Sequence, residues 1–259
     1  MTLATPEALE VRPAAAGLAA GAVAGGELVG FGGVVDVALV RRETVPGRLV
    51  EVRCAEATLR GTGRRRFALD VPEDALPTAR GKECAIAYEL EAREPLGDGS
   101  RVSAPVTLAA SGRPHLEAAA VASVDRLIAN AAAKHHHLEL ADADLCGGGR
   151  ILGRIHRHGP WASEALIVEA TCVEAWRALL PTFAGVPHWE RRLLWTAEAT
   201  VETDPDRMWV PFAFELPEGL PPAVEARALA WRYEISARRH TRFGVDECAV
   251  LTPLLFESA

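Results

Sequence analysis

Hydrophobic and polar residues alternate with a period of two over most of this chain, which predicts half-buried β-strands. The alternation is clearest in two stretches, FALDVPEDALPTARGKECAIAYELEAR from Phe67 to Arg93 and FAFELPEGLPPAVEARALAWRYEISAR from Phe212 to Arg238. In both, an alternating run ends at a Pro-Glu pair and a second run follows a Leu-Pro segment. Proline cannot donate a ladder hydrogen bond. We therefore predict two strands in each stretch, with the first strand ending at the proline.

The two stretches match each other at a single offset of 145 residues, which pairs Tyr88 with Tyr233 and Arg93 with Arg238. The match also keeps the same parity, so the same alternate positions are apolar in both copies, and a chance similarity would not require this. We expect one face of each second strand to point into a core. The inward residues are Ile86, Tyr88, Leu90 and Ala92 in the first copy and Trp231, Tyr233, Ile235 and Ala237 in the second.

The similarity extends beyond these stretches. Both halves contain an Ala-Glu-Ala-Thr strand, and both open with a Leu-Glu strand followed by two glycines four residues apart. We align Gly17 and Gly21 with Gly149 and Gly153, and we expect these glycines in a turn that leads into an edge or bulged strand. Each half then offers about seven short strands in roughly 110 residues, which is typical of an antiparallel β-sandwich.

Residues 111–137 interrupt the strand pattern. The stretch from His115 to His136 is rich in alanine and lacks glycine and proline. Its apolar residues follow helical spacing, and Pro114 suits the start of a helix. We predict an all-β protein with two tandem antiparallel β-sandwich domains, residues 1–110 and 138–259, joined by a linker helix over 111–137.

Composition limits the classes of partner and the cellular location. The chain has 259 residues and a net charge of −7, and no region is strongly basic, so nothing suggests a surface for nucleic acid or anionic lipid. No apolar stretch is long enough to span a bilayer, and the N-terminus does not resemble a signal peptide. The five cysteines are widely spaced without a CxxC pair, which is typical of reduced thiols. We expect a cytoplasmic protein without a transmembrane segment.

The doubled pattern of a phenylalanine strand, Pro-Glu, Leu-Pro and a tyrosine strand resembles the arrestin-like fold, which is immunoglobulin-like in architecture. In size and tandem layout the chain is similar to the bacterial sporulation-control type of arrestin-like protein. The resemblance implies a non-catalytic adaptor or regulatory scaffold. Arrestin-like domains often continue Leu-Pro with Pro-Ser-Phe, and Thr78 and Pro222 begin different sequences here. The first domain also lacks an early lysine pair, so the phosphate-sensing and endocytic roles of animal arrestins do not carry over.

Two groups of residues are candidates for binding a protein partner. Arg64, Arg65 and Arg66 lie just before the Phe67 strand, in a predicted hairpin loop, where they could bind an anionic partner or simply be solvated. Trp161 and Trp189 lie in predicted loops, where tryptophan either anchors a partner or packs into a sandwich end or the domain interface. We expect an unidentified protein partner, no cofactor, and a monomer or homodimer.

The alternative hypothesis is a metal- or small-ligand-binding sandwich, hydrolytic or not. His156 and His158 share a face if their strand continues, but a metal site needs a third ligand that the sequence does not indicate. The Lys134–His137 segment is a poor site because consecutive helical residues point in different directions. Gly147–Gly149 lacks the spacing of a phosphate-binding loop and predicts a turn. The acidic pair Asp142 and Asp144 in this turn could contact a divalent cation, although such pairs are common in turns.

Overall fold

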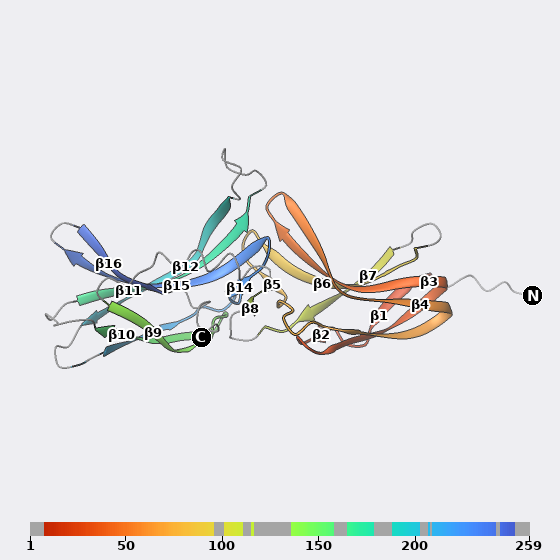
Figure 1. Ribbon diagram of the computed structural model, residues 1–259, viewed down its shortest axis with the longest axis horizontal. Coiled ribbons are helices and arrows are strands. Elements are labelled where there is room, and N and C mark those ends of the chain that lie inside the picture. Colours follow the sequence, from red (N-terminus) through yellow and green to blue (C-terminus); the bar gives the residue numbers. More distant parts are fainter. Residues whose placement is uncertain are drawn as a thin grey trace, which may run out of the picture. The chain divides into compact units, whose positions relative to one another are not determined.

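Every regular element in the described part of the chain is a β-strand, and the strands form three mainly antiparallel sheets (Figure 1). The structure, a computed structural model, describes residues 8–95, 101–110, 115–116, 136–157, 165–178, 188–202, 207, 209–241 and 244–251. The predicted all-β class is confirmed there, and these residues include no helix long and apolar enough to cross a membrane. The chain divides into two compact units: unit 1 is Met1–Arg80 with Ala85–Ala110, and unit 2 is Gly81–Cys84 with Ser111–Ala259.

Unit 1 contains one seven-stranded sheet with the order β1-β3-β6-β7-β2, in which β4 pairs with β3 and β5 pairs with β6. Antiparallel pairing dominates, and the short β2 is parallel to β7. The strands are β1 (Glu10–Pro13), β2 (Gly17–Leu18), β3 (Val23–Val45), β4 (Arg48–Asp70), β5 (Ala79–Arg80), β6 (Ala85–Arg93) and β7 (Arg101–Leu108).

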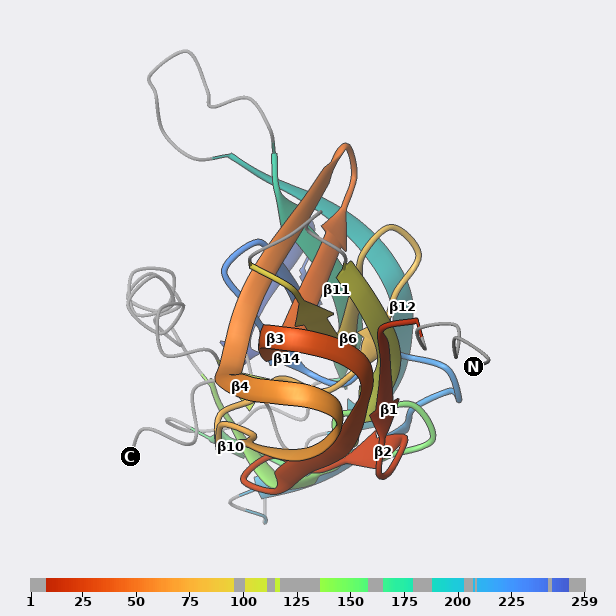
Figure 2. The same ribbon diagram turned by 90° about the vertical axis from the view of Figure 1, so that its right-hand side faces the viewer.

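Strands β3 and β4 are much longer than the short strands that the sequence predicts. They pair with each other along their length, and β3 pairs in addition with β1 at Gly26–Val29 and with β6 at Asp36–Thr44. Between these regions Gly33, with a φ of 114°, faces Gly61, with a φ of 132°. Only glycine adopts such angles readily. The hairpin therefore bends without ending, as the curvature of β3 and β4 in Figure 2 shows.

Unit 2 contains a three-stranded sheet of order β13-β10-β9 and a six-stranded sheet of order β12-β11-β15-β14-β8, in which β16 pairs with β15. The strands are β8 (His115–Leu116), β9 (His136–Ala143), β10 (Arg150–Arg157), β11 (Ala165–Arg177), β12 (Trp189–Glu202), β13 (Trp209–Glu215), β14 (Val224–Glu225), β15 (Leu229–Thr241) and β16 (Gly244–Leu251).

The predicted linker helix lies mostly outside the described residues. Where its span is described, at both ends, the backbone is extended: His115–Leu116 form β8, which pairs with β14, and His136 begins β9. The helical prediction is therefore wrong at these ends. Strand pairing with distant segments overrides local helical propensity there, as tertiary context commonly does.

The predicted inward faces are confirmed. The eight residues assigned to the cores of the two tyrosine strands are all at most 1% exposed. In the phenylalanine strands the apolar residues are buried, and the residues between them are exposed. The buried residues of these strands are Phe67, Leu69 and Val71 in unit 1 and Phe212, Phe214 and Leu216 in unit 2.

A tyrosine hydroxyl anchors the Leu-Pro segment in both units. Tyr88 Oη donates to the carbonyl oxygen of Leu76 at 2.8 Å, and Tyr233 Oη donates to that of Pro221 at 2.9 Å. The two bonds are equivalent, since donor and acceptor are 12 residues apart in each unit. Burial raises the pKa of both hydroxyls. They stay protonated at neutral pH and keep the proton that each bond requires.

The glycine alignment that the sequence suggested is shifted by five residues. Gly26 packs against Phe67, and Gly153 packs against Phe212: an added Cβ would lie 2.5 Å and 2.3 Å from the two ring Cζ atoms. Gly153 is therefore the counterpart of Gly26 rather than of Gly21. The error arose because both halves contain several glycines near their start, and only the contact with the phenylalanine ring distinguishes them.

Replacement of Tyr88 tests the role of the hydroxyl. Tyr88→Phe should lower the free energy of unfolding by about 1–2 kcal/mol, because a buried carbonyl loses its donor. Tyr88→Ala should cost on the order of 3 kcal/mol, because a cavity is added. Urea unfolding of both variants measures the difference. A phenylalanine variant as stable as the wild type would show that the bond contributes nothing.

The glycine contact has a matched control in the same strand. Gly26→Ala should lower the free energy of unfolding by about 1–3 kcal/mol, because the methyl group overlaps the Phe67 ring and the Arg12 carbonyl. Gly32→Ala adds the same methyl group where nothing lies within 4 Å, so its stability should stay within about 0.5 kcal/mol of the wild type. Equal thermal midpoints for the two variants would contradict this assignment.

Candidate functional site

The three consecutive arginines lie on a strand and not in the predicted hairpin loop. Arg64, Arg65 and Arg66 belong to β4, and all three are exposed. They pair across to Val29, Leu28 and Glu27 of β3, respectively. Among the described strands β4 pairs only with β3, so the arginines lie on a strand with one free edge.

Trp189 also begins a strand instead of lying in a loop. It is the first residue of β12, which pairs only with β11 among the described strands. The Arg232 guanidinium lies over its ring, 5.7 Å from the centroid, within cation–π distance. Arg232 in turn donates twice, at 2.7 Å and 2.5 Å, to the fully buried Glu225. The half-buried ring is therefore held in place, and Trp161 lies outside the described residues.

The arginines and Trp189 do not form one site within either unit. Arg64–Arg66 belong to unit 1 and Trp189 to unit 2. What they share is their place on an edge strand. The sequence could not show this, because the pairing partner of a strand is set by residues far away in the chain.

The proposed histidine site contains one described residue. His156 lies on β10, and its Nε2 is 2.5 Å from Oε2 of Glu139 on β9. Arg154 also approaches this carboxylate, at 3.8 Å. His158 lies outside the described residues. Across the described residues no group of three His, Cys, Asp or Glu side chains is arranged to hold a metal ion.

The glycine triplet is a structural turn whose amides are in use. The amides of Gly147, Gly148 and Gly149 donate to the backbone carbonyls of Leu220, Pro217 and Cys146, respectively. These amides cannot also bind a phosphate group without breaking the turn. The turn interpretation from the sequence is confirmed. In the same turn, Asp144 accepts a bond from the Cys146 thiol at 3.1 Å.

Three of the described cysteines are poor nucleophiles. Cys84 and Cys172 are buried, and Cys54 and Cys146 are half-buried, all four as free thiols. Burial raises the pKa of Cys84 and of Cys172 to about 12, and that of Cys146 to about 11. Reactive cysteines instead have lowered pKa values. These three thiols are therefore protonated at neutral pH.

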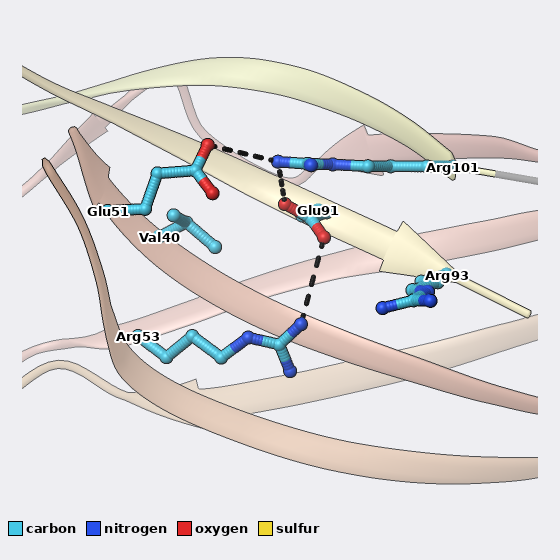
Figure 3. Close-up of a pocket in the computed structure, with 6 residues that line it drawn as sticks. All are labelled: Val40, Glu51, Arg53, Glu91, Arg93 and Arg101. Atoms are coloured by element: carbon cyan, nitrogen blue, oxygen red, sulfur yellow. Dashed lines mark hydrogen bonds and ion pairs between the residues drawn. The ribbon is translucent and has the colours of Figure 1, made fainter. Parts of the chain in front are cut away.

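A charged pocket lies on the outer face of the unit 1 sheet (Figure 3). It has a volume of about 580 Å³ and crosses four adjacent strands. Glu91 on β6 is at its centre, with a side chain only 6% exposed, between Arg101 Nη2 at 2.6 Å and Arg53 Nη2 at 4.0 Å. The lining residues are Val40, Glu51, Arg53, Glu91, Arg93 and Arg101.

The pocket is rimmed by a continuous ion-pair network. Glu51 on β4 contacts Arg101 at 3.3 Å and Arg42 at 3.1 Å, and Arg42 also contacts Glu89 at 2.8 Å. Linked pairs of this kind hold long side chains in fixed positions better than isolated surface pairs do. The network therefore presents a preformed charged surface.

Both units also bury a glutamate at the same sheet position, which the sequence interpretation missed. Glu43 and Glu174 are both 0% exposed. Each lies two residues after the residue that pairs with the core tyrosine on the neighbouring strand. Glu43 pairs with Arg41 at 2.7 Å. Glu174 accepts from Trp231 Nε1 at 3.1 Å and from two backbone amides of the 81–84 segment, both at 3.0 Å. The sequence contained a sign of their burial, because both glutamates lie at the alternate positions that carry the inward apolar residues of their strands.

A second hollow, of about 540 Å³, lies on the outer face of the three-stranded sheet of unit 2. Trp209 lines it and is 42% exposed, and Arg154 lies over the indole ring at 5.4 Å. Much of the remaining lining is apolar, including Leu152 and Pro211. This hollow is less charged than the pocket of unit 1, since Arg154 is its one charged lining residue among those described.

No protein-family model matches the chain, and a search of curated proteins finds no match. The two edge strands, the charged pocket and the buried side chains are the features of the described residues that bear on function. None of these features brings a nucleophile, a base and an oxyanion-stabilising group together among the described residues.

Thiol labelling tests the electrostatic description of the cysteines. In native protein at pH 8, iodoacetamide should leave Cys84 and Cys172 unmodified, because a pKa of about 12 leaves about one thiol in ten thousand ionised. In urea both should react at the rate of free cysteine. Peptide mass spectrometry measures the labelling at each position. Rapid native modification of Cys172 would contradict its burial.

Proposed function

We propose that the protein consists of two tandem arrestin-like β-sandwiches and acts as a non-catalytic cytoplasmic adaptor or regulatory scaffold. Equivalent contacts in the two units support the duplication, above all the tyrosine bonds to Leu76 and Pro221 and the glycine–phenylalanine contacts. The bacterial sporulation-control type remains the family that the sequence resembles. The proposed role is to bind a protein partner, without a cofactor.

The free edge of β4 is the observation that carries the proposed function. This strand has 23 residues and pairs on one side only among the described strands. An exposed strand edge offers a row of backbone donors and acceptors, and an extended peptide can add to it as a further strand. The length of β4 is far more than the five or six residues of an average strand, so it could accommodate a long partner segment.

The charge of the edge specifies the partner's chemistry. The segment from Arg60 to Arg66 has four arginines and no acidic residue, although the whole chain has a net charge of −7. Arginines on an edge also discourage nonspecific strand pairing. An acidic segment would neutralise them and so be selected over other peptides. We therefore expect the partner to contribute an extended segment rich in aspartate or glutamate.

Charge reversal on the edge tests this role. A photo-crosslinking amino acid at position 62, an exposed residue of β4, should capture a specific protein from an extract of the source cells. The R64E/R65E/R66E variant should reduce that capture by about tenfold or more, because attraction to an acidic segment becomes repulsion. Mass spectrometry of the crosslinked product measures both the partner and its contact site.

The R64K/R65K/R66K variant is the matched control. It keeps the three positive charges and the strand, so it should retain most of the capture, whereas a requirement for guanidinium geometry would show as a loss here too. Capture that is equal in the wild type and in the charge-reversed variant would contradict the proposed edge. Circular dichroism of all three proteins verifies that the β-structure is intact.

A further inference from the structure

Arg93 and Arg238 occupy the same position in the two units but have different surroundings. Each lies five residues after the core tyrosine of its unit, and its side chain points to the outer face of the sheet. In unit 2, Arg238 pairs with Glu169 at 3.0 Å and also with Glu198. Two carboxylates therefore neutralise its guanidinium within the unit.

In unit 1 neither of the two corresponding positions supplies a carboxylate to Arg93. Strand pairing places Ala38 opposite Glu56 on β3 and β4, where unit 2 has Glu169 opposite Glu198. Ala38 cannot pair with arginine, and Glu56 contacts Arg53 at 3.4 Å instead. Among the described residues Arg93 forms no ion pair, and Figure 3 shows it beside Glu91 without the links that join Glu91 to Arg53 and Arg101.

The position of Arg93 coincides with the charged pocket. Three arginines and two glutamates line this pocket, which leaves an excess of positive charge. Both glutamates already contact other arginines, Glu51 through Arg42 and Arg101, and Glu91 through Arg53 and Arg101. The remaining guanidinium has donors that fit a carboxylate or a phosphate group, since arginine binds either with two parallel hydrogen bonds.

We propose that this pocket binds an oxyanion group, a carboxylate or a phosphate, that neutralises Arg93 as Glu169 neutralises Arg238 in unit 2. Arg93 is the primary contact, and Arg53 and Arg101 supply further positive charge. The nearly buried Glu91 holds these two side chains in position. A volume of about 580 Å³ is within the range of small-molecule sites, so the pocket has room for more than the anionic group itself.

Isothermal titration with inorganic phosphate and, separately, with succinate tests the proposal in the full chain. Chloride replaces each anion to keep the ionic strength constant, because surface electrostatics weaken with salt. Saturable binding of at least one anion is expected, and the comparison of the two shows whether the site prefers phosphate or carboxylate. The absence of saturable binding for both anions would overturn the proposal.

Two substitutions identify the site. Arg93→Ala removes the primary contact, and Ala38→Glu gives unit 1 the internal carboxylate of unit 2. Each should weaken binding by about tenfold or more. Arg80→Ala is the charge-matched control, because it removes an exposed arginine of the same sheet, on β5, that does not line the pocket, and its affinity should match the wild type.

Arg93→Gln separates a loss of binding from a loss of folding. Should Ala38→Glu fail to fold, Arg93→Gln retains a long polar side chain at an exposed position and removes only the charge. Loss of binding in Arg93→Gln, with unchanged circular dichroism, supports the site. Wild-type affinity in both Arg93 variants, or an equal loss in Arg80→Ala, would overturn it.

Discussion

A buried tyrosine hydroxyl is the constraint on which each unit depends. Tyr88 and Tyr233 fill the core with their rings and bond the carbonyls of Leu76 and Pro221 with their hydroxyls. One side chain thereby packs the core and ties down the loop that follows the phenylalanine strand. A hydrophobic residue could do only the first, because it cannot satisfy a buried carbonyl. The position of the tyrosine also fixes which residues of its strand face outward.

The two units share their inner contacts and differ on their outer faces. The glycine–phenylalanine and tyrosine contacts are nearly identical in geometry. Close packing in the core tolerates little change. On the outer face Ala38, which is only 3% exposed, stands where unit 2 has Glu169. That exchange leaves Arg93 available for an external anion, which makes the outer face of unit 1 a surface suited to binding.

Each unit also has a strand that pairs on one side only among the described strands. The bend at Gly33 and Gly61 lets β4 stay paired with β3 over 23 residues, so it presents one long free edge. In unit 2 the Glu225–Arg232 pair fixes the Trp189 ring at the start of another edge strand, β12. An edge and an anion pocket can serve one partner that has an extended acidic segment.

The sequence by itself determined the β class, the inward faces of the phenylalanine and tyrosine strands and the internal repeat, because period-two alternation and a constant offset can be read from the order of the residues alone. It did not place Arg64–Arg66 on an edge or reveal the glycine register. It also did not distinguish the surroundings of Arg93 from those of Arg238, because both are arginines at the same position of strands in which hydrophobic and polar residues alternate. Only the tertiary structure decided these points. Strand neighbours and ion pairs join residues far apart in the chain, and one carboxylate opposite an arginine determines whether its charge is neutralised within the protein or left for a ligand.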